Sequence, residues 1–164
     1  MVKKGCVTKG KVGFMSPLPD APKNPSYRDV CTGKTSHVEV YDLEYDGNED
    51  SYRSLCKFFF MFHDPTTLNR QGNDRGTQYA SAIFYYDDKQ KAIAQEVLDE
   101  VQKFVKEGKV RYQERQVSTA LHPATTFYAA QEDHQKYLEN NPFGYCNHAF
   151  RFKEWPPKWC HEKN

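Results

Sequence analysis

The run from residue 69 to residue 79 constrains this chain more than any other stretch. Its eleven residues read NRQGNDRGTQY, a mixture of amide, charged and glycine residues that follows neither helical nor strand periodicity. Two glycines permit positive φ angles and close approach of a ligand, and the polar side chains can hydrogen-bond the loop's own backbone. An ordinary polar turn is the simplest interpretation. The setting favours a shaped loop, because HDPTTL leads into it and a strand-like segment, residues 80–86, follows.

The rest of the chain predicts alternating strands and helices. Alternating side chains over residues 37–45 predict a strand that presents Glu39 on one face. Apolar spacing predicts one helix that Asp50 or Ser51 caps and that runs through Phe62, and another that ends before Gly108. The helix that ends before Gly108 covers residues 88–107. Strands are also predicted over residues 11–14 and 110–121, and a third helix is predicted over residues 129–138. Such alternation is typical of an α/β or α+β sandwich.

Composition fits a single domain and excludes several kinds of partner. The 23 Lys and Arg residues balance 22 Asp and Glu residues, so nothing argues for a nucleic acid or an anionic membrane surface. No apolar segment is long enough to span a bilayer. Five cysteines, an odd number without the spacing of a disulfide framework, favour a reducing compartment. We therefore expect a cytoplasmic protein.

Three stretches, taken together, resemble one known family. The first, HDPTTLNRQGNDRGTQYASAIFY (63–85), is similar to the signature of the A-type peptide methionine sulfoxide reductases, which return the S epimer of methionine sulfoxide to methionine. The second, NPSYRDVCTGKT followed by HVEV (24–40), resembles that family's NPTYxxVCxGxTxHAEV segment. The third comprises FY, EDHQKYL and NPFGY (127–145) and resembles its FY, AEDYHQxYL and NPxGY segments. The resemblance covers roughly residues 5–146 in the family's order.

The resemblance implies a fold and an activity. The fold would be of the α+β class, a two-layer α/β sandwich with a mixed, ferredoxin-like sheet over residues 1–146, followed by an irregular tail over residues 147–164. The activity would be the thiol-dependent reduction of methionine sulfoxide in proteins and in free methionine, which repairs oxidative damage. No cofactor would be bound, and thioredoxin or another dithiol would be the reductant. The partners would be thioredoxin and oxidised proteins or peptides.

The resemblance also implies four site residues, which are Glu39, Tyr27, Asp74 and Tyr79. A thiolate must attack the sulfoxide sulfur while the oxygen gains a proton, because that oxygen is a poor leaving group until it is protonated. Glu39 matches the family's acid, which burial would hold protonated. Tyr27 and Tyr79 match two hydroxyls that hydrogen-bond the oxygen, and Asp74 matches a carboxylate that orders the site through water. Outside the motif, a lone strand glutamate would more often face solvent.

One family motif, Gly-Cys-Phe-Trp, does not occur in the 164 residues. Its cysteine is the family's nucleophile and its aromatic pair contacts the substrate methyl group, so we expect an N-terminally incomplete domain with little or no turnover. Cys6 is not the same element, because no Phe-Trp follows it and Tyr27 lies too close in the sequence. It falls where the family has its next strand. An apolar content of 38% and a mean hydropathy of −0.90 agree with the loss of a buried strand and helix.

The cysteines leave several hypotheses open. The resemblance makes Cys146 the candidate recycling thiol and Cys160 a second candidate, while Cys6 is the candidate to replace the nucleophile. Cys31 and Cys56 are predicted to be small core residues.

Two further functions are compatible with these residues. A non-catalytic sulfoxide-binding or interaction protein would keep the pocket without the thiol chemistry. A small metal-binding module would use four ligands of the tail, although their spacing is tighter than in common zinc patterns. These ligands are Cys146, His148, Cys160 and His161.

Overall fold

The structure, a computed structural model, describes residues 5–157. Its strands are β1 (Val7–Met15), β2 (Val38–Tyr45), β3 (Arg70–Gln71), β4 (Asp74–Arg75), β5 (Ala82–Tyr85), β6 (Ala120–Pro123) and β7 (Tyr128–Ala129). Its α-helices are α1 (Tyr27–Cys31), α2 (Glu49–Phe62), α3 (Asp88–Lys106) and α4 (Tyr137–Asn140). Two short 3₁₀ helices are η1 (Thr77–Tyr79) and η2 (Glu132–His134).

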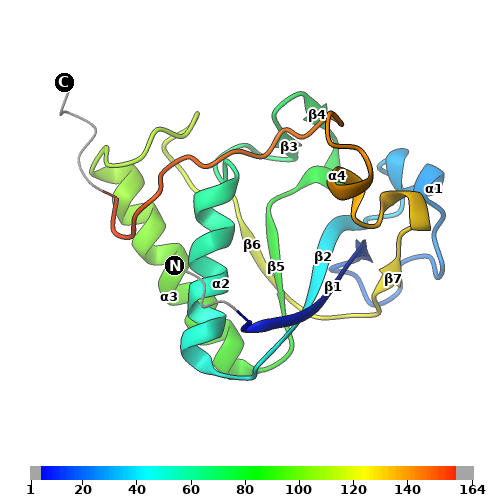
Figure 1. Cartoon of the computed structure of the whole chain (residues 1–164), viewed down its shortest axis with the longest axis horizontal. Coiled ribbons are helices and arrows are strands. Elements are labelled where there is room, and N and C mark those ends of the chain that lie inside the picture. Colours follow the sequence, from blue (N-terminus) through cyan, green and yellow to red (C-terminus); the bar gives the residue numbers. More distant parts are fainter. Residues whose placement is uncertain (1–4, 158–164) are drawn as a thin grey trace.

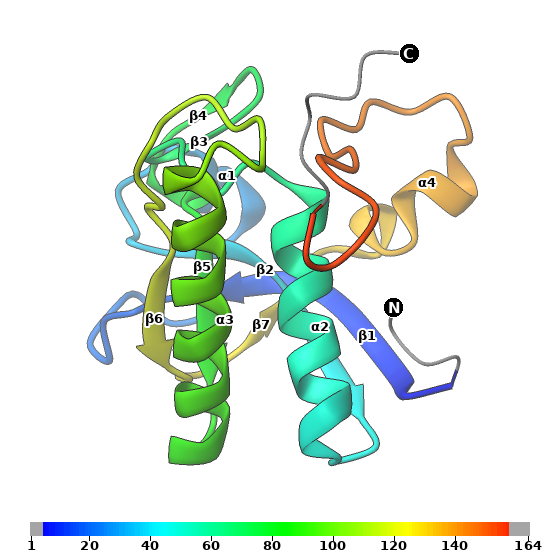
Figure 2. The same cartoon turned by 90° about the vertical axis from the view of Figure 1, so that its left-hand side faces the viewer.

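The strands form one layer and the two long helices another. β1 lies between β2 and β7 in an antiparallel sheet, whereas β5 and β6 form a separate parallel pair. α2 and α3 pack against each other on one side of the strands (Figures 1 and 2). In Figure 1, α1 and α4 lie on the side of the strands away from α3, and the β3–β4 hairpin lies above the strands. The mixed α+β, two-layer architecture expected from the sequence is therefore confirmed.

The two long helices form where capping residues and apolar spacing require them. The side chains of Asn48 and Asp87 accept hydrogen bonds from the first turns of α2 and α3, and Gly108 follows α3 with a φ of +70°. The expected cap of α2 at Asp50 or Ser51 is therefore wrong, because both residues lie inside the helix that Asn48 caps. The helices enclose a core made of Cys56, Phe60, Ala94, Val97, Val101 and Val117. No helix of the described residues is long and apolar enough to cross a membrane.

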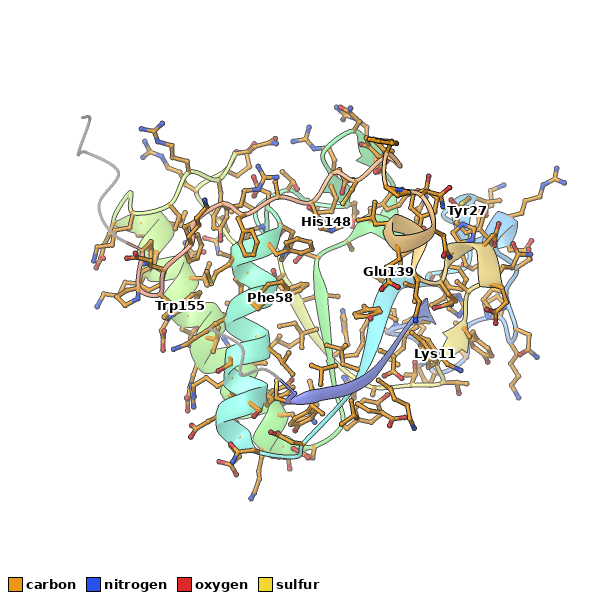
Figure 3. All side chains as sticks on the ribbon, in the orientation of Figure 1. Lys11, Tyr27, Phe58, Glu139, His148 and Trp155 are labelled. Atoms are coloured by element: carbon orange, nitrogen blue, oxygen red, sulfur yellow. The ribbon has the colours of Figure 1, made fainter. Side chains whose placement is uncertain are left out.

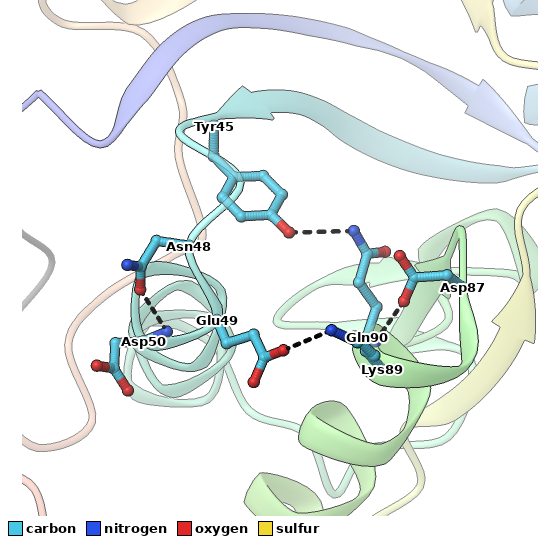
Figure 4. Close-up of polar contacts among 7 residues, drawn as sticks. All are labelled: Tyr45, Asn48, Glu49, Asp50, Asp87, Lys89 and Gln90. Atoms are coloured by element: carbon cyan, nitrogen blue, oxygen red, sulfur yellow. Dashed lines mark hydrogen bonds and ion pairs between the residues drawn. The ribbon is translucent and has the colours of Figure 1, made fainter.

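A group of polar contacts joins the end of β2 to the first turns of both helices (Figure 4). The Gln90 side-chain amide donates to the Tyr45 hydroxyl at 3.3 Å, and Lys89 forms an ion pair with Glu49 at 3.1 Å. These contacts lie at the β2 end that is remote from Glu39, and they fix the helix layer on the sheet.

The predicted strand over residues 110–121 is wrong for most of its length. Only its end is extended, in β6, because the preceding backbone hydrogen-bonds the segment before the polar loop rather than a strand. The Gln113 amide donates to the buried Asp64 carboxylate at 3.0 Å, and the Glu114 amide donates to the Thr66 hydroxyl at 3.0 Å. These two backbone amides therefore bond side chains instead of a neighbouring strand.

The predicted helix over residues 129–138 is also wrong. β7, η2 and α4 replace it, with Lys136 in a left-handed conformation at a φ of +50° between the last two. The Gln135 side chain donates to the Val12 carbonyl at 2.8 Å and accepts from the Val12 amide at 3.0 Å. This long-range pair holds the segment against β1, so tertiary contacts override the local helical spacing.

Residues 147–157 carry no helix or strand, yet they pack closely on the helix layer. The segment crosses from α4 over α2 to α3 (Figures 1 and 3). Phe150 packs against Phe58 and Phe62, the Arg151 amide donates to a carbonyl of α2, and the Trp155 indole N–H donates to Glu100 at 2.7 Å. This segment therefore covers the apolar surface of both long helices.

Candidate active site

A short helix that the sequence did not predict positions Tyr27. α1 begins at a capping box in which the Ser26 hydroxyl accepts from the Asp29 amide while the Asp29 carboxylate accepts from the Ser26 amide. The Tyr27 ring packs on Phe14 of β1, with centroids 6.4 Å apart, and on His134, with centroids 4.4 Å apart. The ring is thus held between β1 and η2.

Glu39 lies in β2 opposite Phe14 of β1. Burial raises the pKa of its carboxyl group; the charge of His134 acts against this increase and the charge of Asp74 adds to it. The Glu39 Oε1 atom is buried and has no hydrogen-bond partner among the residues that the structure describes. A protonated carboxyl group here could donate to an oxygen atom of a bound ligand.

The polar loop is a shaped loop, as expected. β3 and β4 form a tight hairpin around Gly72, whose φ is +59°, and Gly76 has a φ of +140° just before η1. A Cβ atom on Gly76 would collide with the Gln78 side chain. The buried Gln78 in turn donates to the Cys31 carbonyl at 3.4 Å, which fastens the loop to α1. Tyr79 is the next residue, and η1 lies against β2.

Electrostatic interactions link these side chains. A hydrogen bond to Cys31 is the largest cause that raises the pKa of Tyr27, followed by burial and by the charges of Cys31, Glu39 and Tyr79. Burial raises the pKa of Tyr79, and the charges of Glu39, Cys31 and Asp74 raise it further. Both hydroxyls therefore remain protonated donors at neutral pH. The structure thus brings together all four residues that the sequence singled out.

Three more residues belong to this cluster, and the sequence reasoning assigned none of them to it. Cys31 is exposed beside Tyr27, so the prediction that it is a core residue is wrong, whereas Cys56 is buried as expected. Cys31 lies four residues after Tyr27 in the sequence. This spacing could have indicated that Cys31 lies near Tyr27, because residues four apart share a helix face. His134 stacks on Tyr27, and the Asn147 side chain donates to the Asp74 carboxylate and the Gln71 carbonyl. No sequence pattern pointed to Asn147.

The candidate redox cysteines lie in different places. Cys6 is buried beside Asp46, whose amide donates to the Cys6 carbonyl. Asp46, which follows the end of β2, is seven positions after Glu39, and this spacing along a strand corresponds to about 20 Å. Cys146 is exposed, and its Sγ atom lies 4.0 Å from His148 Nδ1. Cys160 and His161 lie outside the described residues. Among residues 5–157, no three His, Cys, Asp or Glu side chains gather closely enough to hold a metal ion.

This arrangement suits chemistry at a polarised oxygen. It offers one protonatable, half-buried carboxyl group, two phenol donors and an accessible thiol. His63 and Ser81 form a serine–histidine pair, but both are buried: the His63 ring also bonds the Phe59 carbonyl, and the Ser81 hydroxyl also bonds Thr119, which is a structural network and not an accessible hydrolytic pair.

Comparison with known proteins agrees with this chemistry. A model of the family "Peptide methionine sulfoxide reductase" matches residues 2–160. Peptide methionine sulfoxide reductase A1 of Arabidopsis thaliana is 41% identical over 156 residues, which cover 95% of this chain and 69% of that protein. The chloroplastic A4 protein of the same plant is 47% identical over 132 residues, which cover 80% of this chain and 47% of that protein.

A solved structure from the same family has a similar fold and a related sequence. Mxr1 from Saccharomyces cerevisiae in its reduced form matches with a TM-score of 0.74 and 37% sequence identity, covering 88% of this chain and 78% of that chain. With a family model that matches nearly the whole chain, these likenesses make the chain a member of the peptide methionine sulfoxide reductase family.

Proposed function

We propose that this protein takes part in the reduction of methionine S-sulfoxide, in oxidised proteins and as the free amino acid. One observation carries the proposal: the half-buried Glu39 side chain, whose buried Oε1 atom lacks a hydrogen-bond partner among residues 5–157, lies near the Tyr27 and Tyr79 hydroxyls. A sulfoxide oxygen is a strong acceptor without a proton of its own. It would complete the hydrogen bonds of these three groups.

The roles of the four residues follow from their chemistry. Glu39 gives its proton to the sulfoxide oxygen as the S–O bond weakens, and Tyr27 and Tyr79 donate hydrogen bonds to the same oxygen. Asp74, which Asn147 holds in place, orders the polar side of the site. Two thiols supply the two electrons, so that sulfoxide and two thiols become thioether, water and a disulfide. Cys146 is our candidate for the second thiol, with Cys160 as the alternative.

The proposed reductant is thioredoxin or another dithiol, and the proposed location is the cytoplasm, where such reductants keep thiols reduced. The four described cysteines are all free, which agrees with this setting. We expect little or no turnover, at most a slow rate, from the 164 residues as given, because they contain no Gly-Cys-Phe-Trp motif.

The test is to measure methionine release from the S and R epimers of a methionine sulfoxide peptide, with dithiothreitol as reductant. We expect release from the S epimer only. Glu39→Gln should lower the rate by about 100-fold, because it removes the proton donor. The matched control is Glu44→Gln, on the same strand, where the side chain is exposed and pairs with Lys9. Equal rates for Glu39→Gln and Glu44→Gln would contradict the role of Glu39.

A second candidate is a non-catalytic sulfoxide-binding protein. The unpartnered Oε1 atom of Glu39 beside two phenol donors favours it, since binding needs the donors and no electrons. Dimethyl sulfoxide, titrated into isotope-labelled protein, should then shift NMR signals of Tyr27, Glu39 and Tyr79 without any methionine release from the peptide. An absence of shifts at these residues would exclude both candidates.

A further inference from the structure

Asn147 makes two hydrogen bonds to the polar loop of the candidate site. Its side-chain amide donates to the Gln71 carbonyl at 2.8 Å and to the Asp74 carboxylate. Gln71 and Asp74 are opposite residues of the β3–β4 hairpin. A single amide group therefore bonds both strands of the hairpin, and it uses both of its N–H donors to do so.

The turn of this hairpin is shaped to admit the Asn147 side chain. Gly72 follows β3 with a φ of +59°, a conformation that favours glycine. The Asn147 Cβ atom lies 3.1 Å from the position that a Cβ atom on Gly72 would occupy. The close approach and the two hydrogen bonds are separate observations, and both place Asn147 against the turn that leads into Asp74.

The same loop is fastened to α1 farther along the chain. The Gln78 side chain donates to the Cys31 carbonyl at 3.4 Å, and Tyr79 is the next residue. Asn147 supplies the second attachment, close to Asp74. The loop that carries both Asp74 and Tyr79 is therefore held from two sides, by α1 and by the segment that follows α4.

The chemistry of the contact requires an amide. A carboxylate accepts hydrogen bonds on both oxygens, and Asn147 binds Oδ2 of Asp74, which fixes the plane of the carboxylate and the direction of Oδ1. Hydrogen bonds to charged groups are stronger than those between neutral groups. Aspartate at position 147 would have the same shape but no donor, and its charge would repel Asp74.

We propose that Asn147 is a positioning residue of the sulfoxide site: its amide fixes the Asp74 carboxylate, so that this carboxylate orders the polar side of the site around a bound sulfoxide in one orientation. The inference rests on the proposed function and gives the segment after α4 a part in substrate binding. In this role Asn147 acts through Asp74 and needs no contact with the substrate.

The experiment is a double-mutant cycle on the full chain. The dissociation constant of a methionine S-sulfoxide peptide is measured by NMR titration without reductant. Asn147→Ala should weaken binding by about fivefold, because it removes the hydrogen bonds that hold the carboxylate. Asp74→Asn should weaken binding at least as much, and the double variant should bind no more weakly than Asp74→Asn alone, because Asn147 acts through Asp74.

The matched control is Asn141→Ala. Asn141 is an exposed asparagine six residues before Asn147, and its amide binds the Tyr137 carbonyl at 3.0 Å, away from the polar loop. This variant should leave the dissociation constant unchanged. In the ligand-free protein, the carboxyl NMR signal of Asp74 should move in Asn147→Ala and stay in place in Asn141→Ala, a readout of the contact itself.

An exchange of the two side chains separates positioning from stabilisation. Asn147→Asp alone should lower thermal stability, because two carboxylates then face each other. Combining it with Asp74→Asn reverses donor and acceptor and should restore part of that stability. Peptide binding should nevertheless stay as weak as in Asp74→Asn, because the carboxylate has changed its place.

The outcomes distinguish this inference from the proposed function. Wild-type affinity in Asn147→Ala would overturn the inference and leave the proposed function standing, as would a loss that persists in full in the Asp74→Asn background. Recovery of peptide binding in the exchanged variant would show that the contact only stabilises the fold, and would also overturn it. A wild-type protein that does not bind the peptide at all would overturn the proposed function and this inference with it.

Discussion

At the scale of single residues, the site depends on a carboxyl group whose pKa is raised among partners of different charge. Burial is the main cause of the raised pKa of Glu39, and its two charged neighbours act in opposite directions. The carboxylate of Asp74 disfavours the ionised form of Glu39, whereas a protonated His134 favours it. The balance between these neighbours sets the pH range in which Glu39 can give a proton to an oxygen.

This balance predicts the titration of Glu39. The midpoint measured by carboxyl NMR should lie above the usual 4.5 of a glutamate. Asp74→Asn should lower that midpoint, because it removes a negative neighbour, and His134→Ala should raise it, because it removes a positive one. Rates of methionine release should fall as pH rises through the measured midpoint, since the proton donor is lost. Two shifts in the same direction would contradict the electrostatic account.

A second residue-scale prediction concerns stability. Burial lowers the pKa of His63 from 6.5 to about 4, so the unfolded chain binds a proton in this interval while the folded chain does not. The stabilisation is therefore complete above pH 6.5 and is lost as pH falls through the interval, by about 3 kcal/mol in total. Urea denaturation at pH 7 and at pH 4.5 should show this loss in the wild type and a smaller loss in His63→Gln. Equal losses would contradict it.

At the scale of elements, sequence patterns predicted those that are held by local signals. Apolar spacing predicted α2 and α3, Gly108 predicted the end of α3, and alternation predicted β2 with Glu39 on it, whereas the cap of α2 was predicted two or three residues too late. The two wrong predictions, the strand over residues 110–121 and the helix over residues 129–138, have the same cause. Hydrogen bonds between distant segments, from Gln135 to Val12 and from Gln113 to Asp64, determine these structures, and no local sequence pattern encodes them. The same holds for the site, because the motifs supplied its four expected residues but contacts of the folded chain were needed to add Cys31, His134 and Asn147.

The polar loop gives a prediction at this scale. Gly76→Ala should destabilise the protein by about 2–4 kcal/mol, because φ is +140° there and the new Cβ would collide with Gln78. Gly47→Ala is the matched control, since Gly47 also has a positive φ, of +74°, but has open space around it. It should cost only about 1 kcal/mol. Thermal unfolding compares the two, and dimethyl sulfoxide binding should weaken in Gly76→Ala alone, because Tyr79 follows the displaced side chain.

At the scale of the whole molecule, the irregular segment that follows α4 links the site to the helix layer. Its first residue, Asn147, binds Asp74 of the site, and Phe150 then packs on the Phe58 and Phe62 rings of α2. Trp155 packs on Phe104 of α3 at a centroid distance of 5.2 Å. The segment therefore closes the apolar surface of the helices and at the same time holds one side of the site.

This arrangement makes Trp155 a test of the whole packing. Trp155→Ala should lower the free energy of unfolding by about 2–4 kcal/mol, because it removes the indole from Phe104 and Phe152 and leaves Glu100 without its donor. Phe143→Ala is the control of similar apolar size, since the Phe143 side chain is fully exposed, and it should change stability by less than about 0.5 kcal/mol. Urea denaturation measures both. If residues 147–157 act as one packed unit, Trp155→Ala should also increase the binding of a hydrophobic dye to the helix layer and weaken sulfoxide binding at the site. A loss of stability without either change would show that the two ends of the segment act independently.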